Sequence, residues 1–446
     1  MKFHELNMTE GNLFKKILIF SVPVMASSMM QLLFNTADMI VVGKFAGAKA
    51  LAAVSSTGPL INLLVNLFIG LSVGVNVVVS RNIGSNKAEE TKKSVHNAIA
   101  ISLISGVLLT VIGFFGARSM LVLMDSPADV IDLSSIYLKI YFLGSTFSLV
   151  YNYGAAILRA KGDAQRPLIF LTIAWIINII LKLFLVVFAE LGVVGVAIAT
   201  VASQAVSCGL VIHYLLKDEN ESTRLHLRYI RISKESAIEI MRVGVPAGIQ
   251  SCLFAISNAV IQSTVNSFGS IAMAGNGAAL NIEGYVYAGM NAFYHSCMTF
   301  TSQNYGAKRF DRVLRTFIIC QFYVLIAGLT LGMGAHHFGH SLLKIYSNDL
   351  SVIEAGMIRL TYATKIYFIY GLMEVAVGGL RGLGYSTGPM LVSICGICIL
   401  RILWIAMVFP LNPTLKVLYL SLPISWVVTG IIQMIMYFAV YIKKKN

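Results

Sequence analysis

Charged side chains are scarce in this sequence. Asp, Glu, Lys and Arg together make up 12% of the 446 residues, whereas soluble globular proteins contain about 25%. Hydrophobic residues make up 57% of the chain. This composition excludes a soluble globule and predicts a membrane protein with many spanning segments.

The sequence also lacks the common catalytic motifs. It contains no P-loop, no Gly-x-Ser-x-Gly and no His-Glu-x-x-His, so an ATP-driven pump or an intramembrane hydrolase would lack its machinery. Nearly all of the six cysteines lie in apolar runs, which gives no disulfide framework. His336, His337 and His340 have helical spacing, but without a fourth ligand we expect no metal site there. We therefore expect neither an enzyme nor a cofactor.

Apolar runs of bilayer length recur along the whole chain. A helix that crosses the hydrocarbon core needs about 20 residues, and reading the runs at this length predicts twelve spanning helices. They cover approximately residues 15–42, 51–80, 95–123, 134–158, 167–189, 192–216, 236–266, 272–302, 314–346, 353–380, 389–410 and 416–442.

Positive residues lie in alternate short loops between these runs. With the N-terminus inside, 23 of the 34 lysines and arginines fall in cytoplasmic segments and five in outer segments, while Asp125, Asp129 and Asp132 gather outside. The positive-inside rule then predicts that both termini are cytoplasmic. The net charge of +14 thus reflects the membrane topology. We expect the basic residues to contact anionic lipid headgroups rather than nucleic acid.

The second half of the chain repeats landmarks of the first half. Ser21 to Asn35 matches Gly244 to Asn258 at an offset of 223 residues, and 80–84 and 158–167 match 302–306 and 380–389 at an offset of 222. Asp38 maps to Ile261, so a charged residue of the first half is not duplicated with the scaffold. We predict two homologous halves, 1–216 and 236–446, joined by a polar linker at 217–235.

Asp38 is the one charged residue in the apolar run 17–42. A carboxylate inside a spanning helix costs about 2.5 to 3.5 kcal/mol on insertion scales, so it normally faces a partner, a cavity or an ion path. Asn152, Asn178 and Lys182 are polar groups that a bundle interior could bring to it. Two interpretations stay open: a protonation or cation site in an amide-lined cavity, or a structural Asp38–Lys182 pair.

Glu283, Glu374 and Arg401 lie inside three separate apolar runs of the second half. Two acids and one guanidinium could share a proton, or they could form a static triad that fixes helix packing. We expect Arg359 nearer the outer end of its helix, where a solvated mouth would account for its charge.

These features together resemble the multidrug and toxic compound extrusion (MATE) family. The resemblance rests on Pro23, Asn35 and Asp38 in the first helix and on the segments 80–84, 158–163 and 378–384, and it covers essentially the whole chain. It implies an all-α polytopic fold of twelve transmembrane helices in two pseudo-symmetric six-helix bundles. It also implies alternating access and export of amphipathic, often cationic small molecules in exchange for protons or sodium.

The resemblance further implies roles for individual residues. Asp38 matches the family's coupling acid, and the second half supplies a further coupling set. The predicted coupling residues are Asp38, Glu283, Glu374 and Arg401, and the predicted polar cavity of the first half contains Asn35, Asn152, Asn178, Lys182 and Thr200.

Lys182 departs from the family pattern, because the family typically has Asp four residues after the Asn of the fifth helix. A sodium site needs hard oxygen ligands, and a buried ammonium beside Asp38 would occupy that position. We therefore expect protons rather than sodium as the coupling ion. We expect a monomer in the bacterial inner membrane, in contact with lipids and small amphiphiles.

Two other functions are alternative interpretations of this sequence. A lipid-linked oligosaccharide flippase of the same superfamily would have a strongly basic central cavity for a pyrophosphate, whereas here acids accompany the few buried positive residues. A membrane receptor or scaffold that transports nothing would leave the buried acids unexplained.

Overall fold

The computed structural model describes residues 5–124, 126 and 130–446, and all regular secondary structure in these residues is helical. The predicted all-α fold is therefore confirmed. Asp125 and Asp129 of the predicted outer acidic group lie outside the described residues.

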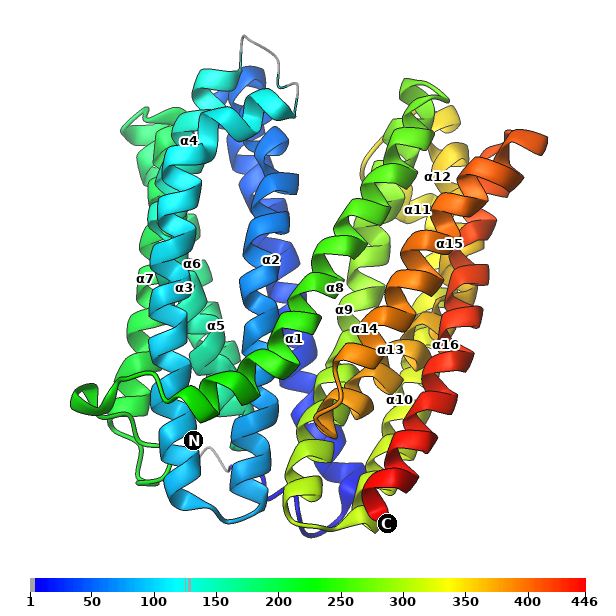
Figure 1. The fold of residues 1–446 in the computed structure, drawn as a ribbon. Coiled ribbons are helices and arrows are strands. Elements are labelled where there is room, and N and C mark those ends of the chain that lie inside the picture. The colour runs from blue at the N-terminus through cyan, green and yellow to red at the C-terminus, as the bar shows by residue number, and fades with distance from the viewer. Residues whose placement is uncertain (1–4, 125, 127–129) are drawn as a thin grey trace. The chain divides into compact units, whose positions relative to one another are not determined.

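The described residues of the first half form seven α-helices, labelled α1 to α7 in Figure 1. Two of these helices continue into a π-helical turn. Their bounds are α1 Leu13–Val41 with η1 Val42–Ala46, α2 Ala48–Gly84, α3 Ala88–Leu123, α4 Ile131–Leu143, α5 Ser145–Ala160, α6 Gln165–Leu183 with η2 Phe184–Phe188, and α7 Gly192–Leu216.

The second half contains nine α-helices and follows a short 3-10 turn, η3 Leu227–Tyr229. Their bounds are α8 Lys234–Asn266, α9 Ser270–Gly306, α10 Phe310–His337, α11 Gly339–Lys344, α12 Leu350–Ala363 with η4 Thr364–Ile366, α13 Tyr367–Gly382, α14 Thr387–Ser393 with η5 Ile394–Ile399, α15 Leu400–Leu403 with η6 Trp404–Val408 and η7 Phe409–Leu411, and α16 Leu415–Lys445.

Each of the twelve predicted segments is mostly helical, and two of them are broken, between α4 and α5 at Gly144 and between α10 and α11 at Phe338. Among the described residues, nine helices are long and apolar enough to cross a membrane, and α4 and α5, bent by 45°, can count together as a tenth. The two remaining predicted spans correspond to α9 and to the broken pair α12 and α13. α12 and α13 are 14 and 16 residues long, so each is shorter than a spanning helix, and α9 carries Glu283 together with several Asn, Gln, Ser and Thr residues.

The chain divides into two compact units. Unit 1 contains the residues up to Leu6 and Met30–Gly248, and unit 2 contains Asn7–Met29 and Ile249–Asn446. Both α1 and α8 therefore change unit along their length. The predicted boundaries at 216 and 236 concern the sequence repeat and stay a prediction.

The backbone repeats its unusual conformations at the offset of 222 residues. Gly162 and Gly384, which follow α5 and α13, have φ of 94° and 79°. Asn86 and Lys308, in the turns after α2 and α9, have φ of 54° and 58°. Because non-glycine residues seldom adopt positive φ, this agreement shows that the two halves share the same turn geometry.

Small residues let the helices of each unit approach closely. In unit 1 a Cβ on Gly70 of α2 would collide with the backbone of Gly248 in α8, and in unit 2 a Cβ on Gly332 of α10 would collide with the Thr364 carbonyl. The absence of a side chain at these glycines thus permits the close approach of the helices.

The predicted linker is attached to unit 1. Asp218 is buried and accepts hydrogen bonds from Lys161 Nζ at 2.5 Å and from Thr223 Oγ1 at 2.7 Å. Glu5 is the second acid on Lys161, at 2.6 Å. These contacts hold the segment after α7 against the end of α5.

Candidate functional site

Asp38 and Lys182 form an ion pair inside unit 1. Asp38 comes from α1 and Lys182 from α6, and the ammonium donates to the Asp38 carboxylate. The Lys182 side chain is only 1% exposed and that of Asp38 is 17% exposed. Because an unpaired ammonium at this depth would be very costly, Asp38 is the counter-charge that allows Lys182 to be buried.

The other predicted polar residues of the first half bond elsewhere. Asn178 Nδ2 donates to Ser203 Oγ at 3.0 Å, Asn152 Nδ2 to the Ser148 carbonyl at 2.8 Å, and Thr200 Oγ1 to the Val196 carbonyl at 3.0 Å. Asn35 is exposed. Among the described residues, none of these side chains hydrogen bonds to Asp38. The structure therefore joins Asp38 to Lys182 and keeps the amides as separate contacts within or between helices.

Helix irregularities follow both charged residues of the pair. The π-helical turn Val42–Ala46 begins within one turn after Asp38, and Phe184–Phe188 begins directly after Leu183, next to Lys182. One turn before Asp38 and two turns before Lys182, the rings of Phe34 and Trp175 pack edge to face with centroids 6.4 Å apart. Since π-helical turns are rare and frequent at functional sites, their position marks this part of α1 and α6 as a candidate site.

Glu283 in unit 2 pairs with Arg359. Arg359 of α12 donates from Nε to Oε1 at 2.7 Å and from Nη2 to Oε2 at 2.9 Å, and both residues are buried. This two-point geometry satisfies both carboxylate oxygens. The expectation that Arg359 lies at a solvated mouth is wrong, because Arg359 is buried and pairs with the buried Glu283 of α9.

Amides and a phenol complete the surroundings of this pair. Arg359 Nη1 and Tyr419 Oη both donate to Asn276 Oδ1 at 2.9 Å, and Asn276 Nδ2 donates to Gln262 Oε1 at 2.7 Å. The sequence analysis did not select Asn276, Gln262 or Tyr419. The rule that a buried acid needs a cation could have found Arg359, but the amides carry no comparable signal.

Glu374 of α13 is buried without an ion pair. The residue is 8% exposed, and its Oε1 has no hydrogen-bond partner. Tyr287, Tyr370 and Arg381 are close enough to interact with its charge. Arg381 itself donates to Tyr294 Oη at 2.6 Å and to Gln250 Oε1 at 2.8 Å.

Arg401 of α15 is a buried cation without an acidic partner among the described residues. Its Nε donates to Ser425 Oγ at 3.0 Å. The expected triad of Glu283, Glu374 and Arg401 is therefore not assembled through direct bonds: Glu283 is neutralised by Arg359, while Glu374 and Arg401 form no ion pair with each other.

The buried acids thus fall into two chemical classes. Asp163, Asp218 and Glu283 are buried and paired with Arg or Lys, and the partly buried Asp38 is paired with Lys182. Within the part of the chain that the structure describes, Glu374 is the buried acid without a salt bridge. A carboxyl in this position can change its charge without first breaking an ion pair.

Comparison with known proteins places this arrangement in a family. The sequence profile of the MatE family matches residues 23–184 and 246–407, once in each half. The chain is 27% identical over 395 residues to the probable multidrug resistance protein YoeA of Bacillus subtilis, covering 87% of this chain and 85% of that protein. It is 24% identical over 409 residues to the multidrug export protein MepA of Staphylococcus saprophyticus, covering 91% and 90%.

A solved structure shares the fold. It is described as the outward-facing conformation of a multidrug resistance MATE family transporter of the MOP superfamily. It superposes with a TM-score of 0.92 over 99% of both chains, at 21% sequence identity. Because the two matched segments together exceed half of the chain, the protein belongs to the MatE family and is a multi-pass membrane transporter rather than an enzyme.

Proposed function

We propose that this transporter is a proton-coupled antiporter that exports amphipathic, often cationic small molecules across the bacterial inner membrane. The names of its relatives, a multidrug resistance protein and a multidrug export protein, support the substrate class. These relatives give no support to the flippase alternative.

The observation that carries the proposed coupling is that Glu374 is buried without an ion pair. A buried carboxylate without a counter-ion is costly, whereas the protonated carboxyl costs far less. Proton binding is therefore favoured in any conformation that desolvates Glu374, and proton release is favoured in one that exposes it. Such a difference between states is what coupling to a proton gradient requires.

Glu283 and Asp38 are less suited to this role. Glu283 has both oxygens occupied by the Arg359 guanidinium, and Asp38 already holds the Lys182 ammonium. Protonating either acid would leave a buried cation without its partner. The same contacts argue against sodium, because a cation would have to compete with an ammonium or a guanidinium for the carboxylate oxygens.

The experiment uses purified protein in proteoliposomes loaded with a fluorescent organic cation. A proton gradient and a sodium gradient are imposed separately on the wild type and on Lys182→Asp. We expect the proton gradient alone to drive transport by the wild type. Transport driven only by sodium would contradict proton coupling. If several different organic cations are tested and neither gradient drives the transport of any of them, the proposed substrate class is wrong.

The Lys182→Asp arm tests why sodium is excluded. This substitution replaces the ammonium with oxygen ligands beside Asp38. If the ammonium is what blocks a sodium site, the variant gains transport driven by the sodium gradient. No gain would mean that the remaining polar groups of unit 1 do not complete a cation site.

A further inference from the structure

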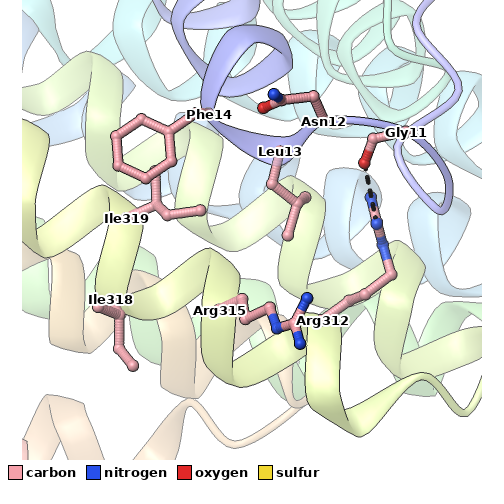
Figure 2. Close-up of a pocket in the computed structure, with 8 residues that line it drawn as sticks. All are labelled: Gly11, Asn12, Leu13, Phe14, Arg312, Arg315, Ile318 and Ile319. Carbon is pink, nitrogen blue, oxygen red and sulfur yellow. Dashed lines mark hydrogen bonds between the residues drawn. The ribbon is translucent and has the colours of Figure 1, made fainter.

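A pocket of about 430 Å³ lies in unit 2 where the N-terminal segment meets the beginning of α10 (Figure 2). Residues 11–14 form one side, and Arg312, Arg315, Ile318 and Ile319 of α10 form the other. It contains none of the predicted coupling residues. What it could bind follows from its two arginines and its apolar wall.

The two arginines differ in how their donors are used. Arg312 donates to the carbonyls of Gly11 at 3.0 Å, Glu10 at 3.1 Å and Met8 at 3.3 Å, and its Nε donates to Asn304 Oδ1 at 3.2 Å. Arg312 therefore fixes the N-terminal segment. Arg315 is exposed and makes no hydrogen bond or ion pair with any described residue.

The internal repeat shows that this arrangement is particular to unit 2. At the offset of 222 residues, Glu90 corresponds to Arg312 and Lys93 to Arg315. In unit 1 Lys93 Nζ pairs with Glu90 Oε1 at 3.1 Å, so the cation has its own acid one turn away. In unit 2 the acid is replaced by a second arginine, and Arg315 has lost that partner.

The positions of these cations are also unfavourable for helix stability. Arg309 precedes the first residue of α10, and Arg312 and Arg315 follow within the first two turns. Positive charge in the first turn of a helix, here Arg309 and Arg312, opposes the helix dipole. Arg309 and Arg315 both repel the Arg312 guanidinium, and Asp311 and Glu10 offset part of this repulsion. An external anion at the pocket would relieve this repulsion.

The pocket continues onto an apolar surface. Phe14, Ile318 and Phe322 are 45%, 55% and 48% exposed, and the Phe14 and Phe322 rings pack edge to face at 6.0 Å. Large apolar side chains exposed on spanning helices face hydrocarbon. A ligand that fills the pocket and follows this wall must therefore carry an anionic group and an apolar chain together.

We propose that this pocket binds an anionic glycerophospholipid of the surrounding bilayer. Arg315 holds the lipid phosphate, and an acyl chain lies along Phe14, Ile318 and Phe322. Anionic headgroups attract basic residues at a membrane surface, and a guanidinium can donate to two phosphate oxygens at once. The bound lipid would lie beside the carbonyls that Arg312 holds, and so would stabilise the N-terminal segment on α10. This inference does not depend on the transported substrate or on the coupling ion.

The test uses the full-length protein, purified in detergent and delipidated. Melting temperature is measured during titration with phosphatidylglycerol, phosphatidylcholine or inorganic phosphate, for the wild type, Arg315→Gln and Lys93→Gln. The last variant removes the same charge at the position that corresponds in unit 1. We expect phosphatidylglycerol to stabilise the wild type and Lys93→Gln equally. We expect Arg315→Gln to need about fivefold more of this lipid for the same shift, since one arginine near an anionic surface contributes about that factor.

Each other outcome overturns the proposal in a defined way. If inorganic phosphate reproduces the stabilisation, the pocket is a site for a soluble anion. If phosphatidylcholine is equally effective, the charge of the headgroup is irrelevant. If Arg315→Gln retains the wild-type response, or if Lys93→Gln loses as much, the lipid acts elsewhere. Because Arg315 is exposed, the variant should fold normally, and its melting temperature without lipid checks this directly.

Discussion

The two units share a scaffold but treat their buried charges differently. In unit 1 the acid of α1 and the ammonium of α6 neutralise each other, and the position corresponding to Asp38 in the second half is Ile261. In unit 2 Arg359 neutralises Glu283, while Glu374 remains a buried acid without an ion pair. The repeat therefore preserved the turns and the close helix contacts of Gly106 with Thr146 and of Gly328 with Phe368, whereas the ionisable groups diverged. Turns and contacts define the fold, and the divergent charges are the candidates for function.

The largest expected effect comes from breaking the Glu283–Arg359 pair. Arg359→Met leaves Glu283 buried with neither oxygen paired to a cation, and we expect a loss of about 3 to 5 kcal/mol in the free energy of unfolding. Glu283→Gln together with Arg359→Met should recover much of this loss, because no charge is then left behind. Denaturant or thermal unfolding of purified protein measures both.

Arg401→Met is the matched control for that prediction. Arg401 is buried to a similar degree but has no acidic partner among the described residues. Its removal therefore leaves no buried carboxylate without a cation. We expect a much smaller loss than for Arg359→Met. Equal losses would mean that size and packing, rather than charge pairing, decide the outcome.

The pair in unit 1 should respond asymmetrically. Asp38→Asn leaves an ammonium that is 1% exposed, whereas Lys182→Met leaves a carboxylate that is 17% exposed. We expect about 3 kcal/mol of destabilisation for the first change and about 1 to 2 kcal/mol for the second. Unfolding of the two variants under identical conditions compares them. The reverse order would show that Lys182 has another counter-charge.

A smaller effect is expected at the surface of unit 1. Glu221 accepts from His226 Nε2 at 2.8 Å and pairs with Lys92 at 3.4 Å, and these contacts, chiefly the hydrogen bond with His226, lower the pKa of Glu221. Because the folded-state pKa is the lower one, the contribution of Glu221 is present above the ordinary Glu pKa of about 4.3. It is lost as the pH falls through the folded-state value.

Hydrogen exchange of residues 217–233 tests this dependence. Wild-type protection should decrease as the pH falls below about 4.3, and Glu221→Gln should show weaker protection at neutral pH with less change on acidification. An equal pH profile in the two proteins would place the acid-sensitive contact elsewhere in the segment.

Much of the fold could be predicted because it depends on local and repeated signals. The lengths of the apolar runs predicted where the long helical segments lie, and the matches at 158–167 and 380–389 predicted turns that do share positive φ at Gly162 and Gly384. The breaks within helices could not be predicted. The π-helical turns after Asp38 and Lys182 and the 45° bend between α4 and α5 have no counterpart in the length or spacing of the apolar runs.

The pairing of buried charges was only partly predictable. Asp38 and Lys182 could be matched as the two ions of the first half, and the structure joins them. In the second half several partners were possible, and the rule that a buried acid seeks a cation does not say which one. The choice of Arg359 over Arg401 for Glu283 depends on which faces of α9 and α12 meet.

The most direct measurement separates coupling from transport itself. In proteoliposomes, proton-driven accumulation of a fluorescent cation is compared with exchange of labelled for unlabelled cation without any gradient, for the wild type, Glu374→Gln and Asp38→Asn. We predict that Glu374→Gln loses proton-driven accumulation and keeps exchange. We predict that the folded fraction of the Asp38→Asn protein keeps proton-driven accumulation. Proton-driven accumulation by Glu374→Gln at the wild-type rate would contradict the assignment of the coupling proton to this acid.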